Sequence, residues 1–212
     1  MIQPQDRILF IGDSITDAFR KPEEINDAYQ MGNGYAFLVA SQLRAQRPAD
    51  ALLFFNRGIS GEGLRGLEAR WDNDVLALRP DVISVLVGIN DTLCAFRGHE
   101  VSSPDDVGAR YLALLEYTRK VLPDVRFVVC EPFLLRADEI TDEKIAHLRE
   151  RAAAIRQSST RFGAVFVPFQ EMLDAACNIA PPEYWAYDGI HPTAAGHFLL
   201  ARQWLEVVEN TR

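Results

Sequence analysis

The sequence predicts an α/β fold in which helices cover both faces of a parallel β-sheet. Short apolar runs alternate with longer segments whose apolar residues recur every three to four positions. Runs that are apolar throughout indicate strands buried on both faces, as in a parallel sheet. The clearest run, at residues 82–87, is closed by Gly88. Five strands are expected, at residues 7–11, 52–56, 82–87, 126–130 and 164–167.

The segments between these runs have the periodicity of helices. In the first of them, Phe37, Leu38 and Leu43 fall on one side. Ser103-Pro104 precedes another, a combination typical of a helix N-terminus. We expect helices at residues 34–47, 64–78, 104–122, 142–161 and 194–208.

Three polar loops follow the first three strands and should open onto the same edge of the sheet. They begin at Gly12, at residues 56–61 and at residues 88–91. In parallel sheets ligands bind beyond the carboxyl ends of the strands, so a site is expected at this edge.

Composition and charge limit the classes of function. The 212 residues are 48% hydrophobic and show no repeat, which favours a single domain spanning residues 1–212. A net charge of −8 argues against nucleic acid as a partner. The sequence shows no signal peptide and no apolar run long enough to span a membrane. Three scattered cysteines fit reduced thiols, so we expect a cytoplasmic protein.

Ser14, Asp188 and His191 supply the parts of a nucleophilic triad. Ser14 follows the first strand, and Asp188 and His191 share one short loop before the last helix. On one turn, the carboxylate of Asp188 can orient the imidazole of His191, which would act as the base toward Ser14. The order Ser, Asp, His usually accompanies a Gly-x-Ser-x-Gly elbow, which residues 58–62 fail to complete because Glu62 stands last.

Each residue alone also has a structural explanation. Ser14 could be a helix N-cap or a turn residue, and a His-Pro pair before a helix is often only a cap. The other histidines have weaker contexts: His147 is expected on a solvated helix face, His99 in a polar loop and His197 in packing within the last helix.

Acyl transfer also needs donors for the oxyanion. The Gly58 N–H after the second strand, the Asn90 amide after the third and the Ser14 N–H are the candidates. Glycine and asparagine are also ordinary turn residues, so Gly58 and Asn90 are weak signals when taken singly.

Four segments together resemble the blocks of the SGNH (GDSL) hydrolase superfamily. They are Gly12-Asp13-Ser14-Ile15-Thr16, Asn56-Arg57-Gly58-Ile59-Ser60-Gly61, Gly88-Ile89-Asn90-Asp91 and Asp188-Gly189-Ile190-His191. The resemblance implies a flavodoxin-like, three-layer α/β/α fold and an esterase with Ser14, Asp188 and His191 as its triad. It implies an oxyanion hole of Ser14, Gly58 and Asn90, and a structural Asp13 that holds neighbouring loops by hydrogen bonds.

A narrower resemblance extends to intracellular acetylxylan esterases of this superfamily. The segments NRGISGEGLRGLEARW, GINDT and HPTAAGHFLLA carry it. It implies removal of acetyl groups from xylo-oligosaccharides and self-association into a homo-oligomer. The alternatives are a short-chain carboxylesterase, thioesterase or lysophospholipase with the same triad, or a non-catalytic flavodoxin-like ligand-binding module. No cofactor or metal is expected, because no metal-ligand spacing is present.

Aromatic residues near the triad are candidates for substrate binding. Tyr184 and Trp185, with Tyr187 beside them, directly precede Asp188, and Phe133 follows the fourth strand. Their rings could stack on the apolar face of a sugar or pack the loop onto the body of the domain. Trp71, which follows the Gly58 loop, could line the opposite wall of the site, but packing within its helix is the favoured interpretation.

Overall fold

The five strands form one parallel sheet in a computed structural model that describes residues 1–24, 27–99, 102–137 and 139–211. Its strand order is β2-β1-β3-β4-β5, and every neighbouring pair is parallel. This is the flavodoxin-like order, so the predicted fold class is confirmed. The strands are β1 (Arg7–Gly12), β2 (Leu53–Gly58), β3 (Val82–Leu86), β4 (Arg126–Cys130) and β5 (Val165–Val167).

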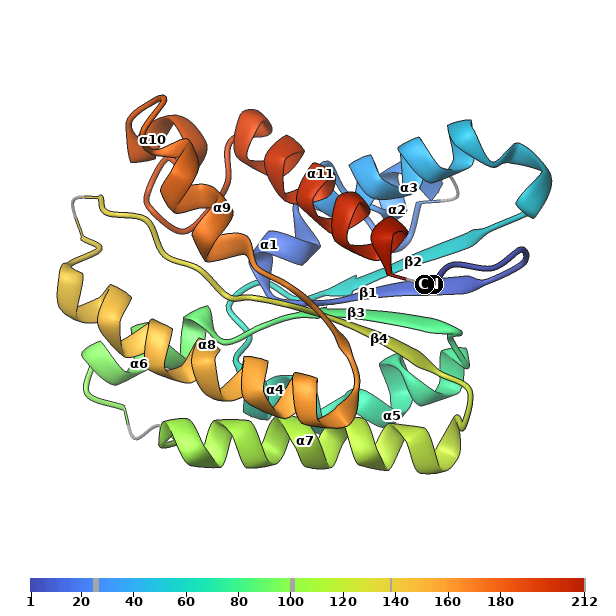
Figure 1. The fold of residues 1–212 in the computed structure, drawn as a ribbon, viewed down its shortest axis with the longest axis horizontal. Coiled ribbons are helices and arrows are strands. Elements are labelled where there is room, and N and C mark those ends of the chain that lie inside the picture. Colours follow the sequence, from blue (N-terminus) through green and yellow to red (C-terminus); the bar gives the residue numbers. More distant parts are fainter. Residues whose placement is uncertain (25–26, 100–101, 138, 212) are drawn as a thin grey trace.

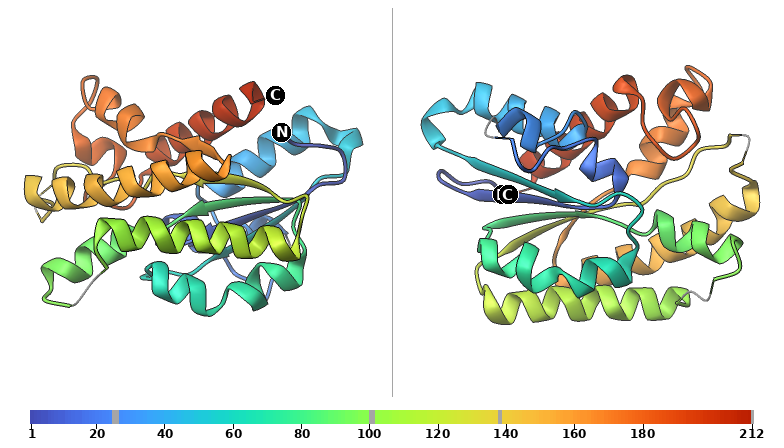
Figure 2. Two further views of the ribbon diagram at one scale, coloured as in Figure 1. Left: turned by 60° about the horizontal axis from the view of Figure 1, so that its bottom comes forward. Right: turned by 180° about the vertical axis from the view of Figure 1, so that it is seen from behind.

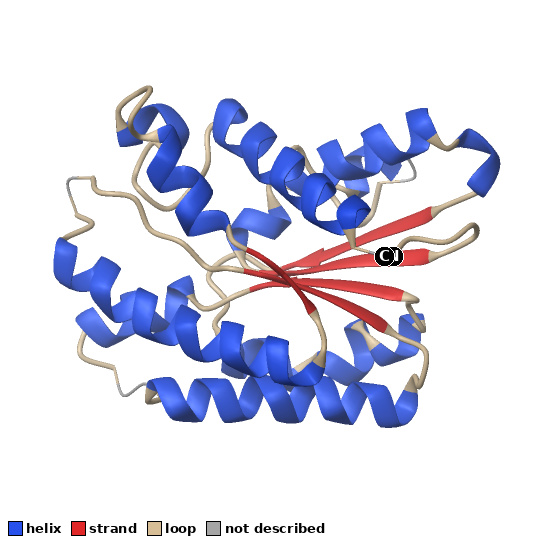
Figure 3. Cartoon of the chain, in the orientation of Figure 1, coloured by secondary structure: helices blue, strands red, loops and turns tan. Residues whose placement is uncertain are grey.

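Helices cover both faces of this sheet, as Figures 1 and 3 show from one side and Figure 2 from two others. One face carries α1 (Ser14–Asp17), α2 (Asp27–Gln30), α3 (Tyr35–Gln46), α9 (Phe169–Ala176), α10 (Pro182–Trp185) and α11 (Ala194–Asn210). The other carries α4 (Leu64–Ala69), α5 (Trp71–Asp74), α6 (Ile89–Phe96), α7 (Pro104–Val121) and α8 (Asp142–Phe162). Short 3-10 turns, Pro48–Asp50 and Leu76–Leu78, lead into β2 and β3. None of the helices within the described ranges could cross a membrane.

The central strand β1 explains why its sequence is apolar without alternation. Ile8 and Phe10 are buried in the core under α3 and α11, where the Phe10 ring packs against Trp204. Leu9 and Ile11 are buried in the opposite core under α4, α5 and α7. Because both faces of the strand are covered, both sets of side chains have to be apolar.

The carboxyl ends of the first three strands meet at one edge, as predicted. Gly12 pairs with Gly58 of β2 on one side and with Leu86 of β3 on the other. The close fit requires glycine at position 12, because a Cβ there would lie 2.0 Å from the Leu86 carbonyl oxygen. The loops after β1, β2 and β3 therefore start side by side.

The segment predicted as one helix at residues 64–78 is instead α4, α5 and a 3-10 turn. The backbone leaves helical geometry at Arg70 (φ −108°, ψ 5°), and Arg79 ends the segment in a left-handed conformation. Trp71 begins α5 and donates from its ring N–H to Thr118 of α7, so it belongs to the core as expected. The short helices α1, α6 and α9 were not predicted, since each spans too few residues to show a clear periodicity.

Candidate active site

Ser14 lies in the first turn of α1, directly beyond the end of β1. The N-cap of this helix is Asp13, whose Oδ1 accepts a hydrogen bond from the Ile15 N–H at 3.0 Å. Ser14 is therefore not the N-cap residue that its sequence context also allows. Its own N–H is one of the donors that a helix start leaves unpaired, and it has no acceptor among the residues that the structure describes.

The side chains of Ser14, His191 and Asp188 form one chain of hydrogen bonds. The Ser14 Oγ lies 3.0 Å from His191 Nε2, and His191 Nδ1 lies 2.6 Å from Asp188 Oδ2. In a neutral imidazole whose Nδ1–H donates to Asp188, Nε2 is left to accept from the Ser14 hydroxyl. This is the arrangement in which a serine can lose its proton to an imidazole.

Asp188 is fixed by its own loop. Its Oδ1 accepts from the main-chain N–H groups of Ile190, at 2.9 Å, and His191, at 2.7 Å. Partial burial alone would raise the pKa of this carboxyl, but the hydrogen bonds from His191 and Ile190 outweigh it and hold the pKa below its usual value. Asp188 is thus held ionised, as the partner of an imidazole has to be.

Gly189 gives this loop its shape. It has φ +79°, and a Cβ there would lie 2.4 Å from the Leu135 carbonyl oxygen. Its own carbonyl accepts from the Leu135 N–H at 2.8 Å, which attaches the loop to the segment after β4. Tyr187 then stacks on the His191 ring, with a centroid separation of 5.9 Å and an interplanar angle of 19°.

Asn90 lies in the first turn of α6, on the same edge. Its side-chain amide donates to the main-chain carbonyl of Glu62 at 3.0 Å. An amide has two N–H donors, so one remains for a ligand. Asn90 and the Ser14 N–H are thus both able to donate to an oxyanion.

Gly58 does not have the free N–H that the sequence suggested, and this prediction is wrong. Its N–H donates to the Asn56 side-chain oxygen at 2.8 Å and is buried. The next glycine in the loop, Gly61, fits better: it has φ +82°, and its N–H has no acceptor in the described part of the chain. It also directly precedes Glu62, the residue bound by Asn90. The signal in the sequence was that the segment at residues 56–61 contains a second glycine, Gly61.

Phe133 is not a pocket wall. It is fully buried and packs edge-on against Phe169, with ring centroids 6.5 Å apart. The main chain at Leu134 is bound to the Gln170 side chain, which turns this segment toward the core. The prediction failed because the direction of a side chain after a strand end depends on such tertiary contacts.

Trp185 and Tyr184 also lie apart from the triad. The Trp185 ring N–H donates to the carbonyls of Ala176 and Ala180, and the ring lines a cavity of about 660 Å³ between α9 and α11. No triad residue lines that cavity. Tyr184 is 56% exposed and packs edge-on against the Trp185 ring. Of the three neighbouring aromatic side chains, that of Tyr187 is the one in ring contact with a triad residue.

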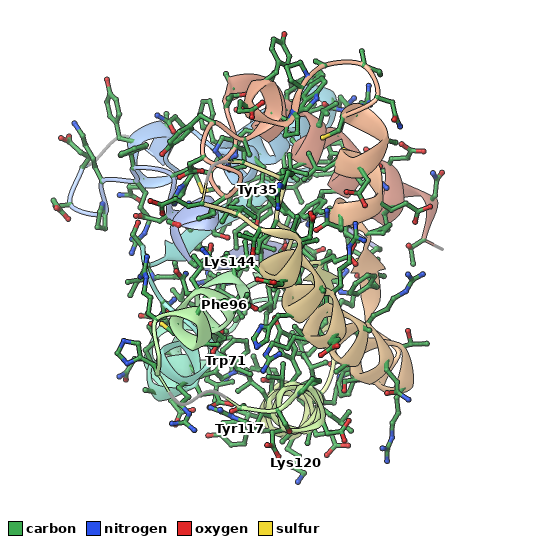
Figure 4. All side chains as sticks on the ribbon, turned by 90° about the vertical axis from the view of Figure 1, so that its left-hand side faces the viewer. Tyr35, Trp71, Phe96, Tyr117, Lys120 and Lys144 are labelled. Atoms are coloured by element: carbon green, nitrogen blue, oxygen red, sulfur yellow. The ribbon has the colours of Figure 1, made fainter. Side chains whose placement is uncertain are left out.

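A cavity of about 490 Å³ opens beside Asp188. Two partly exposed rings, Phe96 and Tyr187, line it together with four charged residues, Arg97, Glu139, Lys144 and Glu183. Figure 4 looks onto this end of the molecule, with Lys144 next to Phe96, and Lys144 Nζ lies 6.0 Å from the centre of that ring. Aromatic faces beside charged hydrogen-bonding groups suit a ligand that is apolar on one side and polar at its rim.

Two of the other histidines have defined structural roles. His197 Nδ1 accepts from the Tyr35 N–H at the start of α3, and burial lowers the pKa of His197 to about 4. His147 is half-buried, bonds to Thr92 and packs against Phe96, so the expected solvated face is wrong. His191, in contrast, contacts Ser14, the candidate nucleophile.

Asp13 is 1% exposed, and its Oδ2 has no hydrogen-bond partner in the described part of the chain. Burial raises its pKa to about 7. Within the described residues its side chain makes one hydrogen bond, from the Ile15 N–H in its own turn, so the carboxylate does not hold neighbouring loops as expected. Within the described ranges, no group of three or more His, Cys, Asp or Glu side chains is placed to hold a metal ion.

The sequence matches the GDSL-like Lipase/Acylhydrolase family over residues 10–199. It is 31% identical over 208 residues to an acetylxylan esterase from Geobacillus stearothermophilus, covering 96% of this chain and 94% of that protein.

Solved structures extend these similarities. A GDSL-like protein from Parabacteroides merdae has a TM-score of 0.93 at 38% identity, covering 99% of this chain and 98% of that one. An acetylxylan esterase from Geobacillus stearothermophilus has a TM-score of 0.88 at 30% identity, covering 98% and 95%. Catalytic mutants of that esterase with a serine, an aspartate or a histidine replaced by alanine have also been solved.

Proposed function

The chain belongs to the GDSL-like lipase/acylhydrolase family and is a serine-type carboxylic ester hydrolase, and on this premise we propose that it removes acetyl groups from acetylated xylo-oligosaccharides through an acyl-enzyme on Ser14. The observation that carries the proposal is the hydrogen-bonded chain from Ser14 through His191 to Asp188, beside a cavity with aromatic and charged walls.

In the first half of the reaction, Ser14 Oγ attacks the acetyl carbonyl carbon. Its proton moves to His191 Nε2, which accepts from the hydroxyl at 3.0 Å. The ionised Asp188 stabilises the imidazolium that forms. The carbonyl electron pair moves to the oxygen, giving a tetrahedral intermediate.

The developing oxyanion is stabilised by N–H groups fixed before the substrate arrives. The Ser14 N–H and the second N–H of Asn90 donate, and the Gly61 N–H takes the place first expected for Gly58. Donors fixed in advance need no reorganisation at the transition state, which is why each contributes strongly.

The intermediate collapses when the bond to the sugar oxygen breaks. His191 gives its proton to that oxygen, the sugar leaves as an alcohol, and the acetyl group remains on Ser14. Water then attacks the acetyl-enzyme with His191 as base, and acetate leaves as the Ser14 hydroxyl is restored.

Carbohydrate is favoured as the leaving group by the walls of the cavity beside Asp188. A sugar ring offers C–H faces to Phe96 and Tyr187 and hydroxyl groups to Lys144 and Glu183. The similarity to an acetylxylan esterase over nearly the whole chain points to the same class of substrate.

The experiment is acetate release from acetylated xylo-oligosaccharides by the wild-type protein, with Ser14→Ala as the matched blank. We expect rapid release by the wild type and none by the variant. 4-Nitrophenyl acetate is assayed in parallel with both proteins.

If the wild type cleaves the aryl acetate but not the oligosaccharide, the carbohydrate part of the proposal is wrong. Profiling acyl esters and thioesters by chain length then separates a short-chain esterase from a thioesterase or lysophospholipase. Equal activity of Ser14→Ala and the wild type on both substrates would exclude Ser14 as the nucleophile.

A further inference from the structure

Arg70 is a largely buried arginine between α4 and α5 that has no part in the reaction described above. Its side chain is 13% exposed, and its partner Glu62 is 11% exposed. An arginine has five N–H donors, and burial without acceptors would cost considerable free energy. All five of these donors have acceptors.

Three of the four acceptor residues, Gly12, Arg57 and Glu62, lie on separate segments of the active-site edge. Nε and Nη2 donate to the carboxylate of Glu62, with Nε at 2.7 Å from Oε2. Nη2 also donates to the Gly12 carbonyl at 3.3 Å, and Nη1 to the Arg57 carbonyl at 2.7 Å. The remaining bond joins Nη1 to Asp74 Oδ2 within the same turn of helix, at 2.7 Å.

Each of these segments leads into an oxyanion donor. The Gly12 carbonyl is two residues before Ser14 and also accepts from the Ile59 N–H at 2.9 Å. Glu62 follows Gly61, and its carbonyl is the acceptor for the Asn90 amide. One guanidinium group thus connects the segment before the nucleophile with the loop that carries the other donors.

We propose that Arg70 is a positioning residue, which holds the 59–63 loop and Asn90 in register with Ser14 so that their N–H groups converge on one oxyanion. This inference rests on the proposed function. If Arg70 served only as a positive charge beside Glu62, it would not need to donate to the carbonyls of Gly12 and Arg57. Binding both carbonyls and the carboxylate at once takes several N–H groups in the planar arrangement of a guanidinium. Lysine, with three donors on one nitrogen, cannot replace it.

The chain offers a matched control in the pair formed by Arg110 and Glu68. Arg110 donates from Nε to Glu68 Oε1 at 3.0 Å and from Nη2 to Glu68 Oε2. This pair joins α7 to α4, and the other hydrogen bond of Arg110 goes to Ser102, so neither Gly12, Arg57 nor Glu62 is among its partners. Substitution of Arg110 therefore removes a similar ion pair from the same side of the sheet and leaves the contacts of the catalytic loops in place.

The experiment compares Arg70→Met, Arg70→Lys, Arg110→Met and Arg110→Lys with the wild type in hydrolysis of 4-nitrophenyl acetate. Rates are expressed per active site, titrated with a fluorophosphonate. We expect both Arg70 variants to lose about 10- to 100-fold in kcat with KM within about twofold, because only the transition state needs convergent donors. Both Arg110 variants should keep kcat within about twofold.

A double-mutant cycle gives a second, independent measurement. If Arg70 acts through the Glu62 carbonyl on Asn90, then Arg70→Lys should cost much less in an Asn90→Ala background than in the wild type. The cycle needs only the conservative Arg70→Lys variant, so it still applies if Arg70→Met does not fold.

Wild-type kcat in Arg70→Lys, equal losses in the Arg70 and Arg110 variants, or additive effects in the cycle would each overturn the inference. These results are distinct from failure of the proposed function, which would appear as equal activity of Ser14→Ala and the wild type in the same assay. A carbohydrate substrate is not needed at any step.

Discussion

The side-chain amide of Asn90 donates to the main-chain carbonyl of Glu62 across 3.0 Å, which joins the start of α6 to the 59–63 loop. That bond fixes the direction of the second amide N–H, which we assign to the oxyanion. Asn90→Ala removes this donor and should lower kcat by about 10²–10³-fold, with little change in KM. Steady-state hydrolysis of 4-nitrophenyl acetate measures both.

Asn90→Asp is the informative companion variant. It keeps the size of the side chain but replaces a donor with an acceptor that is negatively charged, so its kcat should fall at least as far. A kcat within twofold of wild type for either variant would show that the amide does not donate in the transition state.

Gly61 should be sensitive to substitution for a conformational reason. Its φ of +82° is one that L-residues avoid, although an added Cβ would meet no atom within 4 Å. Alanine would therefore cost about 1–2 kcal/mol in this conformation, and relaxation of the loop would turn the N–H away from the site. We expect Gly61→Ala to lower kcat on 4-nitrophenyl acetate at least tenfold.

Gly163 is the matched control for Gly61. It has φ +83°, its Cβ would also meet nothing within 4 Å, and it ends α8 as its C-cap. Gly163→Ala should lose comparable stability in urea unfolding but keep its kcat. A similar kcat for Gly61→Ala and Gly163→Ala would remove Gly61 from the oxyanion hole.

The sequence was sufficient for the strands and for the meeting of Ser14, Asp188 and His191. Continuous apolar runs such as residues 7–11 have one physical explanation, burial on both faces, and parallel strands bring their following loops to one edge. The Asp-x-x-His spacing places both side chains on one turn. Local rules therefore predicted the strands and the Asp188–His191 pair, whereas the resemblance of four segments to the SGNH blocks predicted that Ser14 joins them.

Features that depend on distant partners were not predictable in this way. The Gly58 N–H could be excluded as a donor only once the Asn56 side chain was seen to occupy it. Phe133 follows a strand end like the catalytic residues, but it turns into the core. The helix expected at residues 64–78 breaks at Arg70, whose guanidinium reaches segments far away in the sequence.

Asp13 should make stability depend on pH. Its folded pKa of about 7 lies above the usual 3.8, so the folded state keeps a proton that the unfolded state has released. The stability that this contributes is present below pH 3.8 and is lost as pH rises toward 7. Asp13→Asn does not titrate, so its free energy of unfolding relative to wild type should rise between pH 4 and 7, as measured by urea titration. A pH-independent difference would show that Asp13 is ionised in the folded protein.

His197 should act in the opposite direction over the same range. Its folded pKa of about 4 lies below the usual 6.5, so the unfolded state takes up a proton first as pH falls. The stability that neutral His197 contributes is present above pH 6.5 and is lost as pH falls toward 4. In His197→Asn, the side-chain oxygen can still accept from the Tyr35 N–H, and stability relative to wild type should rise as pH falls. We expect the stability difference from wild type to rise with pH for Asp13→Asn and to fall with pH for His197→Asn. If both differences changed in the same direction, one of the two assignments would be wrong.

Phe96 should distinguish carbohydrate esters from simple esters. It is 44% exposed and lines the cavity beside Asp188, where a sugar face can stack on its ring. Phe96→Ala should raise KM for acetylated xylo-oligosaccharides by about 3- to 10-fold, the loss expected for one aromatic contact. It should leave kcat/KM for 4-nitrophenyl acetate within twofold, because that ester does not extend along the cavity.

Tyr117 is the control for Phe96, since it is 43% exposed and lies on α7, at the bottom of the view in Figure 4. Tyr117→Ala removes a comparable area of exposed ring outside the cavity and should change neither substrate's kinetics. If Phe96→Ala slowed both esters equally, the ring would support the fold of the catalytic edge through its contact with His147. A rise in KM for the oligosaccharide alone, with its kcat unchanged, would instead place the sugar against Phe96, because the ring would then affect binding and not the chemical step.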